Sequence, residues 1–278
     1  MSVLLMTVWL TGCVQEELGS TPSPTGNGIR FTLTVPDVNL PSVSSRTMTG
    51  TGTAKKEDEI ETVDILVFDM SKTPAVYLEC VSATGVTQDL ADNSTVSFSA
   101  VLSPTTASTC IVVVANKELD NIVPGFIKGT TTKVEAMEKM LHAQTGKWLA
   151  DGSTTGGYTR IPMYGEKVIS KITPSMDPIT GINMKRMLAR IDIRNNSATS
   201  NFTVEEVYLA NYNTTGYIAP AWNTNGQVTD PAPDTPVLPV NSGKMTEEGD
   251  AILYSVKGNT PYDGEIYTFE SLAAEDAG

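Results

Sequence analysis

The first side chain in this sequence that could carry out chemistry is the thiol of Cys13. It ends the motif Leu10-Thr11-Gly12-Cys13, which follows an uncharged and mostly apolar opening. A short apolar run ending in Leu-x-Gly-Cys is typical of a lipoprotein signal peptide, which a peptidase removes before the cysteine takes up lipid. The sequence therefore predicts that residues 1–12 are a signal peptide and that Cys13 is lipidated. Acyl chains then tether the mature protein to a membrane.

Other side chains suited to metal or nucleophilic chemistry are sparse. Two further cysteines, Cys80 and Cys110, lie in apolar, strand-like runs. They are either small buried hydrophobic side chains or, in an exported protein, partners in a disulfide. The single histidine, His142, is interpreted as a surface residue of a helix. Since zinc-ligand spacing, a Gly-x-Ser-x-Gly elbow and a phosphate-binding loop are all missing, the sequence predicts no enzyme, no metal and no cofactor.

Length and net charge limit the number of domains and the kinds of partner that we expect for this protein. The chain has 278 residues, which favours one large or two ordinary domains, and 40% of its residues are hydrophobic, enough for a sizeable core. The formal net charge is −13. A surface of this sign repels phosphate backbones, so nucleic acid is not an expected partner.

Strict alternation marks the first folded element. Ile29, Phe31, Leu33 and Val35 are spaced two apart and therefore share one face of a strand. A polar tether, residues 13–28, precedes this strand, and a polar loop containing Arg46 follows it at 41–59. Further strands are expected at 60–69, 76–81, 95–102, 110–115, 167–173, 182–193, 202–210, 251–256 and 265–269.

One helix interrupts the strands. Thr132 precedes Glu135 by three residues, the pattern of a capping box at a helix start. Apolar residues at helical spacing follow and are expected to pack in the core: Val134, Met137, Met140 and Leu141. Gly146 is the expected helix end.

Many short strands, turn residues between them and one helix predict a mostly β protein built of β-sandwich domains. We expect an N-terminal sandwich at 29–177, containing the short helix, and a C-terminal one at 178–278. The stretch 219–243 is rich in Pro, Asn and Gly and is expected to be a surface loop.

The order of several segments resembles the FimA-type and Mfa-like fimbrillins of the Bacteroidetes. The likeness begins with the motif at Cys13 and the acidic residues that follow it, which resemble the surface-export signal of lipoproteins from that phylum. It continues through the alternating strand and the loop Ser44-Ser45-Arg46-Thr47. Later segments that resemble the family are 59–69, 112–116, 161–165, 184–193 and 265–271.

The resemblance implies two transthyretin-like β-sandwiches and a structural role in a surface fimbrium. In this family, subunits arrive as outer-membrane lipoproteins, and a protease then cuts after an arginine in the first long loop. Arg46 and Thr47 match that cut. The cut releases the strand carrying Ile29, Phe31, Leu33 and Val35, and a strand from the next subunit replaces it. Implied partners are other fimbrial subunits, the membrane through the lipid, and a host or bacterial surface ligand in adhesion.

Family members continue beyond the segment matching 265–271, so the second sandwich is expected to be incomplete in this chain. An anchor or tip component remains an alternative to a polymerising subunit. A different class is also open, a glycan-binding surface lipoprotein of a polysaccharide-uptake system. For that class the candidate sugar-stacking side chains are Trp148, Tyr158, Tyr217 and Trp222.

Overall fold

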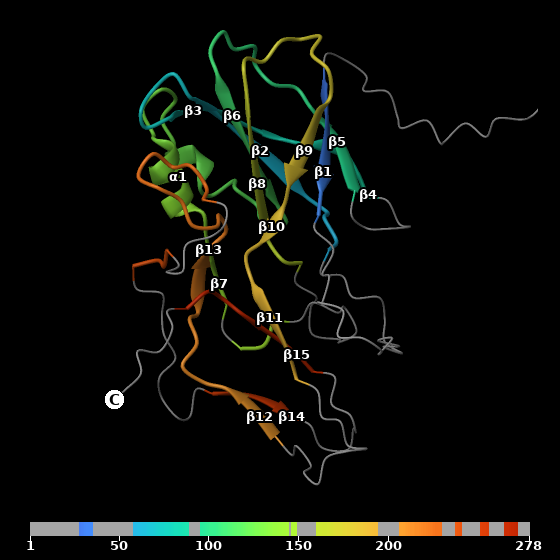
Figure 1. Cartoon of the computed structure of the whole chain (residues 1–278), viewed down its shortest axis with the longest axis vertical. Coiled ribbons are helices and arrows are strands. Elements are labelled where there is room, and N and C mark those ends of the chain that lie inside the picture. The colour runs from blue at the N-terminus through green and yellow to red at the C-terminus, as the bar shows by residue number, and fades with distance from the viewer. Residues whose placement is uncertain are drawn as a thin grey trace, which may run out of the picture.

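The computed structural model shows a mostly β protein with one α-helix in the part of the chain that it describes (Figure 1). The described residues are 28–35, 58–88, 95–144, 146–148, 160–193, 206–229, 237–240, 251–255 and 264–271. Among them, no helix combines the length and apolar character needed to cross a membrane.

Two sheets form the main β-sandwich. The four-stranded sheet has the order β4 (Thr84–Gln88), β5 (Thr95–Ala100), β1 (Ile29–Thr34) and β9 (Ile179–Asn183). The five-stranded sheet has the order β10 (Lys185–Arg186), β8 (Met163–Ile169), β6 (Thr109–Ala115), β2 (Val63–Asp69) and β3 (Val76–Ser82). Strand β4 was not expected, because its residues Thr84–Gln88 are mostly polar.

The five-stranded sheet is covered on both faces. One face packs on the four-stranded sheet, and the core between the two includes Phe31, Ile65 and Val113. The opposite face carries a second core, which includes Leu66, Val112 and Met137 of the helix. All seven residues of β6 are buried. A strand buried on both faces needs apolar residues at every position, which explains the continuous run at 110–115.

The helix α1 spans Lys133–Lys139, after the short 3₁₀ turn η1 (Val123–Gly125). Its expected capping box is confirmed: the Thr132 hydroxyl accepts a hydrogen bond from the Glu135 backbone, and the Glu135 carboxylate accepts one from the Thr132 backbone. The expected helix end at Gly146 is wrong. After the C-cap Met140, the chain enters a short strand, β7 (Leu141–Ala143), which pairs with β13 (Thr215–Tyr217).

The remaining described strands form three two-stranded sheets: β7 with β13, β11 (Ala189–Ile193) with β15 (Gly264–Thr268), and β12 (Glu206–Leu209) with β14 (Ile252–Ser255). The strands β11, β15, β12 and β14 lie below the main sandwich in Figure 1. Two strands that follow residue 178 pair within the main sandwich, since β9 is bonded to β1 and β10 to β8. We therefore propose that the first domain extends through Arg186.

Candidate functional site

The strand β1 lies inside the four-stranded sheet, between β5 and β9 (Figure 1). It pairs with β5 in antiparallel orientation through six consecutive residues and with β9 in parallel orientation. Although β1 comes first in the chain, its neighbours come from residues 95–100 and 179–183. The strand therefore completes a sheet whose other members are far away in the sequence.

The three alternating apolar residues of β1 and Val35, which directly follows the strand, are all in the core. Ile29, Phe31, Leu33 and Val35 have exposed fractions of 4%, 1%, 0% and 1%. Between them, Arg30 and Thr34 are exposed. The predicted common face is confirmed, and it is directed into the core between the two sheets. Burying a side chain of this size contributes roughly 1.5–3 kcal/mol, so β1 accounts for a substantial share of the stability of this core.

Each apolar side chain of β1 lies opposite a different residue of β5. Ile29 lies opposite Ala100, Phe31 opposite Phe98 and Leu33 opposite Val96. The rings of Phe31 and Phe98 are stacked, with centroids 5.0 Å apart and planes only 7° from parallel.

The β9 side of the strand is less regular. The pairing of β1 with β9 shifts between Phe31 and Leu33, and Gly181, within β9, has a φ of +72°. Past this irregularity, the Met184 backbone donates a hydrogen bond of 2.9 Å to the Thr34 carbonyl. From Met184 the chain leaves the four-stranded sheet for β10 of the other sheet. The space beside Gly165 of β8 makes this crossing possible, since a Cβ atom there would lie 2.7 Å from the Met184 sulfur.

Removing β1 would do two things to this sheet. It would uncover the apolar slot that its side chains fill, and it would leave backbone groups of β5 and β9 without partners. An extended segment with apolar side chains at every second position would restore both, which is the chemistry of strand addition. The site is thus a candidate acceptor groove. Cys13, Arg46 and Thr47, the other predicted site residues, lie outside the described residues.

The two described cysteines do not form a disulfide. Strand β2 lies between them: Cys80 of β3 is opposite Leu66, and Cys110 of β6 is opposite Phe68. Strands on either side of a third are roughly 9–10 Å apart, beyond the reach of a disulfide. Both side chains pack against the core that contains Met137, and burial raises the pKa of each thiol to about 12. Of the two alternatives predicted for Cys80 and Cys110, hydrophobic side chains packed in the core or disulfide partners, the first is correct.

His142 is not on a helix surface, so that interpretation is wrong. It lies on β7, opposite Gly216 of β13, and its ring is 5.1 Å from that of Trp148. Its Nδ1 atom is buried and has no hydrogen-bond partner among the described residues. Burial, with a smaller effect from the charge of Lys117, lowers the pKa of His142 to about 4.

This pKa predicts a pH dependence of stability. The unfolded chain binds a proton at His142 near pH 6.5, whereas the folded chain binds it only near pH 4. Stability contributed by neutral His142 is therefore present above pH 6.5 and is lost as the pH falls from 6.5 to 4. We expect a loss of roughly 1–2 kcal/mol after allowing for partial exposure. In urea unfolding between pH 4 and 7, His142→Phe should remove this part of the slope. An unchanged slope would contradict the prediction.

An ion pair for which the sequence shows no local signal joins α1 to β8. Lys133, the first residue of the helix, is 1% exposed, and its Nζ atom lies 2.6 Å from Glu166 Oε2. The Tyr164 hydroxyl donates a 2.5 Å hydrogen bond to the same oxygen, and the Val228 backbone donates one of 3.4 Å to Oε1. Burial, with the nearby Glu166 charge, raises the pKa of Tyr164 well above its ordinary value. The network therefore fixes the segment around Val228 against the main sandwich.

The aromatic side chains proposed for sugar stacking divide into three cases. Trp148 is 5% exposed and packs in the core beside His142, so it offers no face to a ligand. Tyr217 and Trp222 are half-buried and contact one another edge to face at 4.9 Å. Tyr158 lies outside the described residues. Of the three described side chains, only Tyr217 and Trp222 therefore keep part of their surface exposed.

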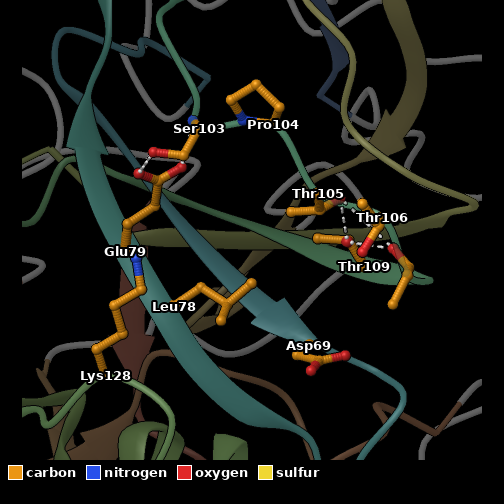
Figure 2. A pocket seen from close by; sticks show the side chains of 10 residues that line it. Asp69, Leu78, Glu79, Ser103, Pro104, Thr105, Thr106, Thr109 and Lys128 are labelled. Carbon is orange, nitrogen blue, oxygen red and sulfur yellow. Dashed lines mark hydrogen bonds between the residues drawn. The ribbon is translucent and has the colours of Figure 1, made fainter.

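A cavity of about 250 Å³ lies where the loop between β5 and β6 meets β3 (Figure 2). The Glu79 carboxylate accepts hydrogen bonds from the Ser103 backbone and hydroxyl, at 2.7 and 2.6 Å. Figure 2 also shows the hydroxyls of Thr105 and Thr109 bonded to each other, at 2.9 Å. The bonds to Glu79 tie the loop to β3, and the bond between Thr105 and Thr109 ties it to the start of β6, which gives the polar groups a structural role. Among the described residues, no group of three or more His, Cys, Asp or Glu side chains could hold a metal ion.

The fold and the groove define the class: a β-sandwich protein whose first described strand occupies a slot between two strands from later in the chain. The model of the major fimbrial subunit protein (FimA) family matches residues 29–201, well over half of the chain. The chain belongs to that family. The family implies a place in a cell-surface appendage and assembly with other subunits.

Solved structures are similar to this chain at low identity. A fimbrial assembly protein from Parabacteroides distasonis is 12% identical, with a TM-score of 0.40, and the match covers 86% of this chain and 85% of that protein. A protein of the same organism, described as a proposed cell adhesion protein, is 19% identical, with a TM-score of 0.45 and coverages of 90% and 73%. A Bacteroides thetaiotaomicron protein, described with a proposed role in polysaccharide binding, is 11% identical, with a TM-score of 0.41 and coverages of 88% and 72%. These values are too low to inform function. No curated protein sequence matches the chain.

Proposed function

We propose that this protein is a fimbrial subunit that joins its neighbour by donor-strand exchange. The observation that carries the proposal is the position of β1, whose apolar face is buried while its two neighbours come from distant parts of the chain. Loss of a strand in this position leaves β5 and β9 with an open slot between them. The family supports assembly with other subunits, and the slot supplies a mechanism for it.

In the exchange, a donor strand with the same alternation of apolar residues replaces β1. A donor strand that fills the slot regains the backbone hydrogen bonds of β5 and β9 and the apolar burial of Ile29, Phe31, Leu33 and Val35. Without a donor, the exposed apolar slot and unpaired edges would favour aggregation. We therefore expect release of β1 and insertion of the donor to be coupled events, with other fimbrial subunits as the donors. No catalytic group, metal or cofactor takes part.

Two steps before exchange complete the proposal. Acylation of Cys13 holds the precursor on the outer membrane, and cleavage between Arg46 and Thr47 separates β1 and the lipid from the rest of the chain. The strand is then held only by non-covalent contacts, so a donor strand can replace it. The assembled fimbrium at the cell surface binds a host or bacterial ligand in adhesion.

The intact mass of the protein, isolated from the outer surface of its own cells, tests this proposal. A chain that begins at Thr47 has lost the lipid and β1, as exchange requires. A chain that begins at acylated Cys13 still carries β1. That result would contradict exchange in this subunit and would favour a tethered anchor.

A further inference from the structure

Strand β5 presents three side chains of different sizes to the slot. Ala100, Phe98 and Val96 face the positions of Ile29, Phe31 and Leu33, and all three are buried, with exposed fractions of 3%, 3% and 0%. The order small, aromatic, branched makes the three positions unequal. A strand that enters the slot therefore meets a defined size pattern and not a uniform apolar wall.

The central position has the most demanding geometry. Phe31 and Phe98 lie on the same face of an antiparallel pair, directly opposite one another, and their rings stack at 5.0 Å and 7°. Ring pairs of this kind stabilise beyond the area that they bury. An aliphatic side chain in place of Phe31 would lose the stacked contact and leave part of the space beside the Phe98 ring unfilled.

Register in the slot is determined on the β5 side. The pairing of β1 with β5 runs without interruption from Ile29 opposite Ala100 to Thr34 opposite Thr95. The pairing with β9 shifts within the strand, so β9 does not impose one continuous register. A slip of two residues keeps the apolar face inward but moves the ring away from Phe98 and toward Ala100 or Val96.

From this geometry we infer that Phe98 selects the partner's strand, in both side chain and register. The donor is an extended segment of another subunit with an aromatic residue at the Phe31 position. Aliphatic residues stand two positions before this aromatic residue and two and four positions after it. The inference rests on the proposed strand exchange and adds its specificity. A donor with the right hydrophobic period but no aromatic residue at that position is a poor partner.

Peptide exchange into the full chain tests the selection. A site for a sequence-specific protease is placed between Arg46 and Thr47, and the chain is folded and then cut, so that its own β1 stays bound. Fluorescent peptides are held at a low, fixed concentration, the cut chain is titrated into them, and their affinities are measured by anisotropy. One peptide has the sequence of residues 29–35, IRFTLTV. The other has the same composition, with its phenylalanine and its leucine exchanged, which places the ring opposite Val96.

We expect the exchanged peptide to bind about 10-fold more weakly than the native one. In the Phe98→Leu chain the difference should shrink to less than about 3-fold, because the stacking partner is missing. Equal binding of the two peptides to the unsubstituted chain would overturn the selection by Phe98 while strand exchange itself stands. If the native peptide does not enter the cut chain, strand exchange is overturned, and the selection with it.

Discussion

Replacement of Phe31 by alanine is expected to lower the free energy of unfolding by about 3–5 kcal/mol. The side chain is 1% exposed, lies in the core between the two sheets and stacks on Phe98. Its removal takes away the transfer free energy of the ring and leaves a cavity that rigid strands on both sides cannot close. Equilibrium unfolding in urea, followed by circular dichroism, measures the loss.

A substitution on the other face of the same strand supplies the control. Thr34 is exposed, so Thr34→Ala should change the free energy of unfolding by less than about 0.5 kcal/mol. If Phe31→Ala costs no more than Thr34→Ala, β1 is not an integral part of the folded sandwich. The groove assigned to it would then have no basis.

Removal of the Glu166 carboxylate is the second substitution for which we expect a large loss in the free energy of unfolding. In Glu166→Leu, the buried ammonium group of Lys133 loses the partner that lies 2.6 Å away, and we expect a loss of about 3–5 kcal/mol. The Tyr164 hydroxyl loses its acceptor in the same substitution. Thermal and urea unfolding both report this loss.

A second substitution separates charge from packing. When Lys133→Met is added to Glu166→Leu, the unpaired charge disappears, and at least half of the lost free energy should return. Glu138→Gln, on an exposed position of the same helix, should have little effect. If the double variant is no more stable than Glu166→Leu alone, the cost lies in packing and not in the uncompensated charge of Lys133.

Local patterns in the sequence predict those elements whose structure depends on residues that are close together in the chain. The alternation at Ile29–Thr34 predicts a strand and its buried face, and the apolar run at 110–115 predicts the strand β6. The capping box places the start of α1 at Thr132. In each case the residues that carry the signal lie within a few positions of one another, so the propensity of the segment and the fold agree.

Elements that depend on distant partners could not be found in this way. Leu141–Ala143 is a strand only because it pairs with Thr215–Tyr217, more than 70 residues later. The local pattern therefore predicts too long a helix and places His142 on it. Strand β9 belongs beside β1 through a parallel pairing across about 150 residues. Lys133 follows the helix cap and is of a residue type usually found on the surface. Nothing near it in the sequence indicates that it is buried and paired with Glu166, 33 residues later.

A photo-crosslinking amino acid at Ser97 of β5 tests the central claim most directly. Ser97 lies opposite Thr32 of β1 and is half-buried, so the probe reports which strand occupies the slot without disturbing its apolar face. In the unassembled chain, the crosslink should join Ser97 to residues 29–35 of the same molecule. In assembled fimbriae, mass spectrometry should find it joined to a segment of another subunit. A crosslink in fimbriae that still joins Ser97 to its own residues 29–35 would contradict strand exchange.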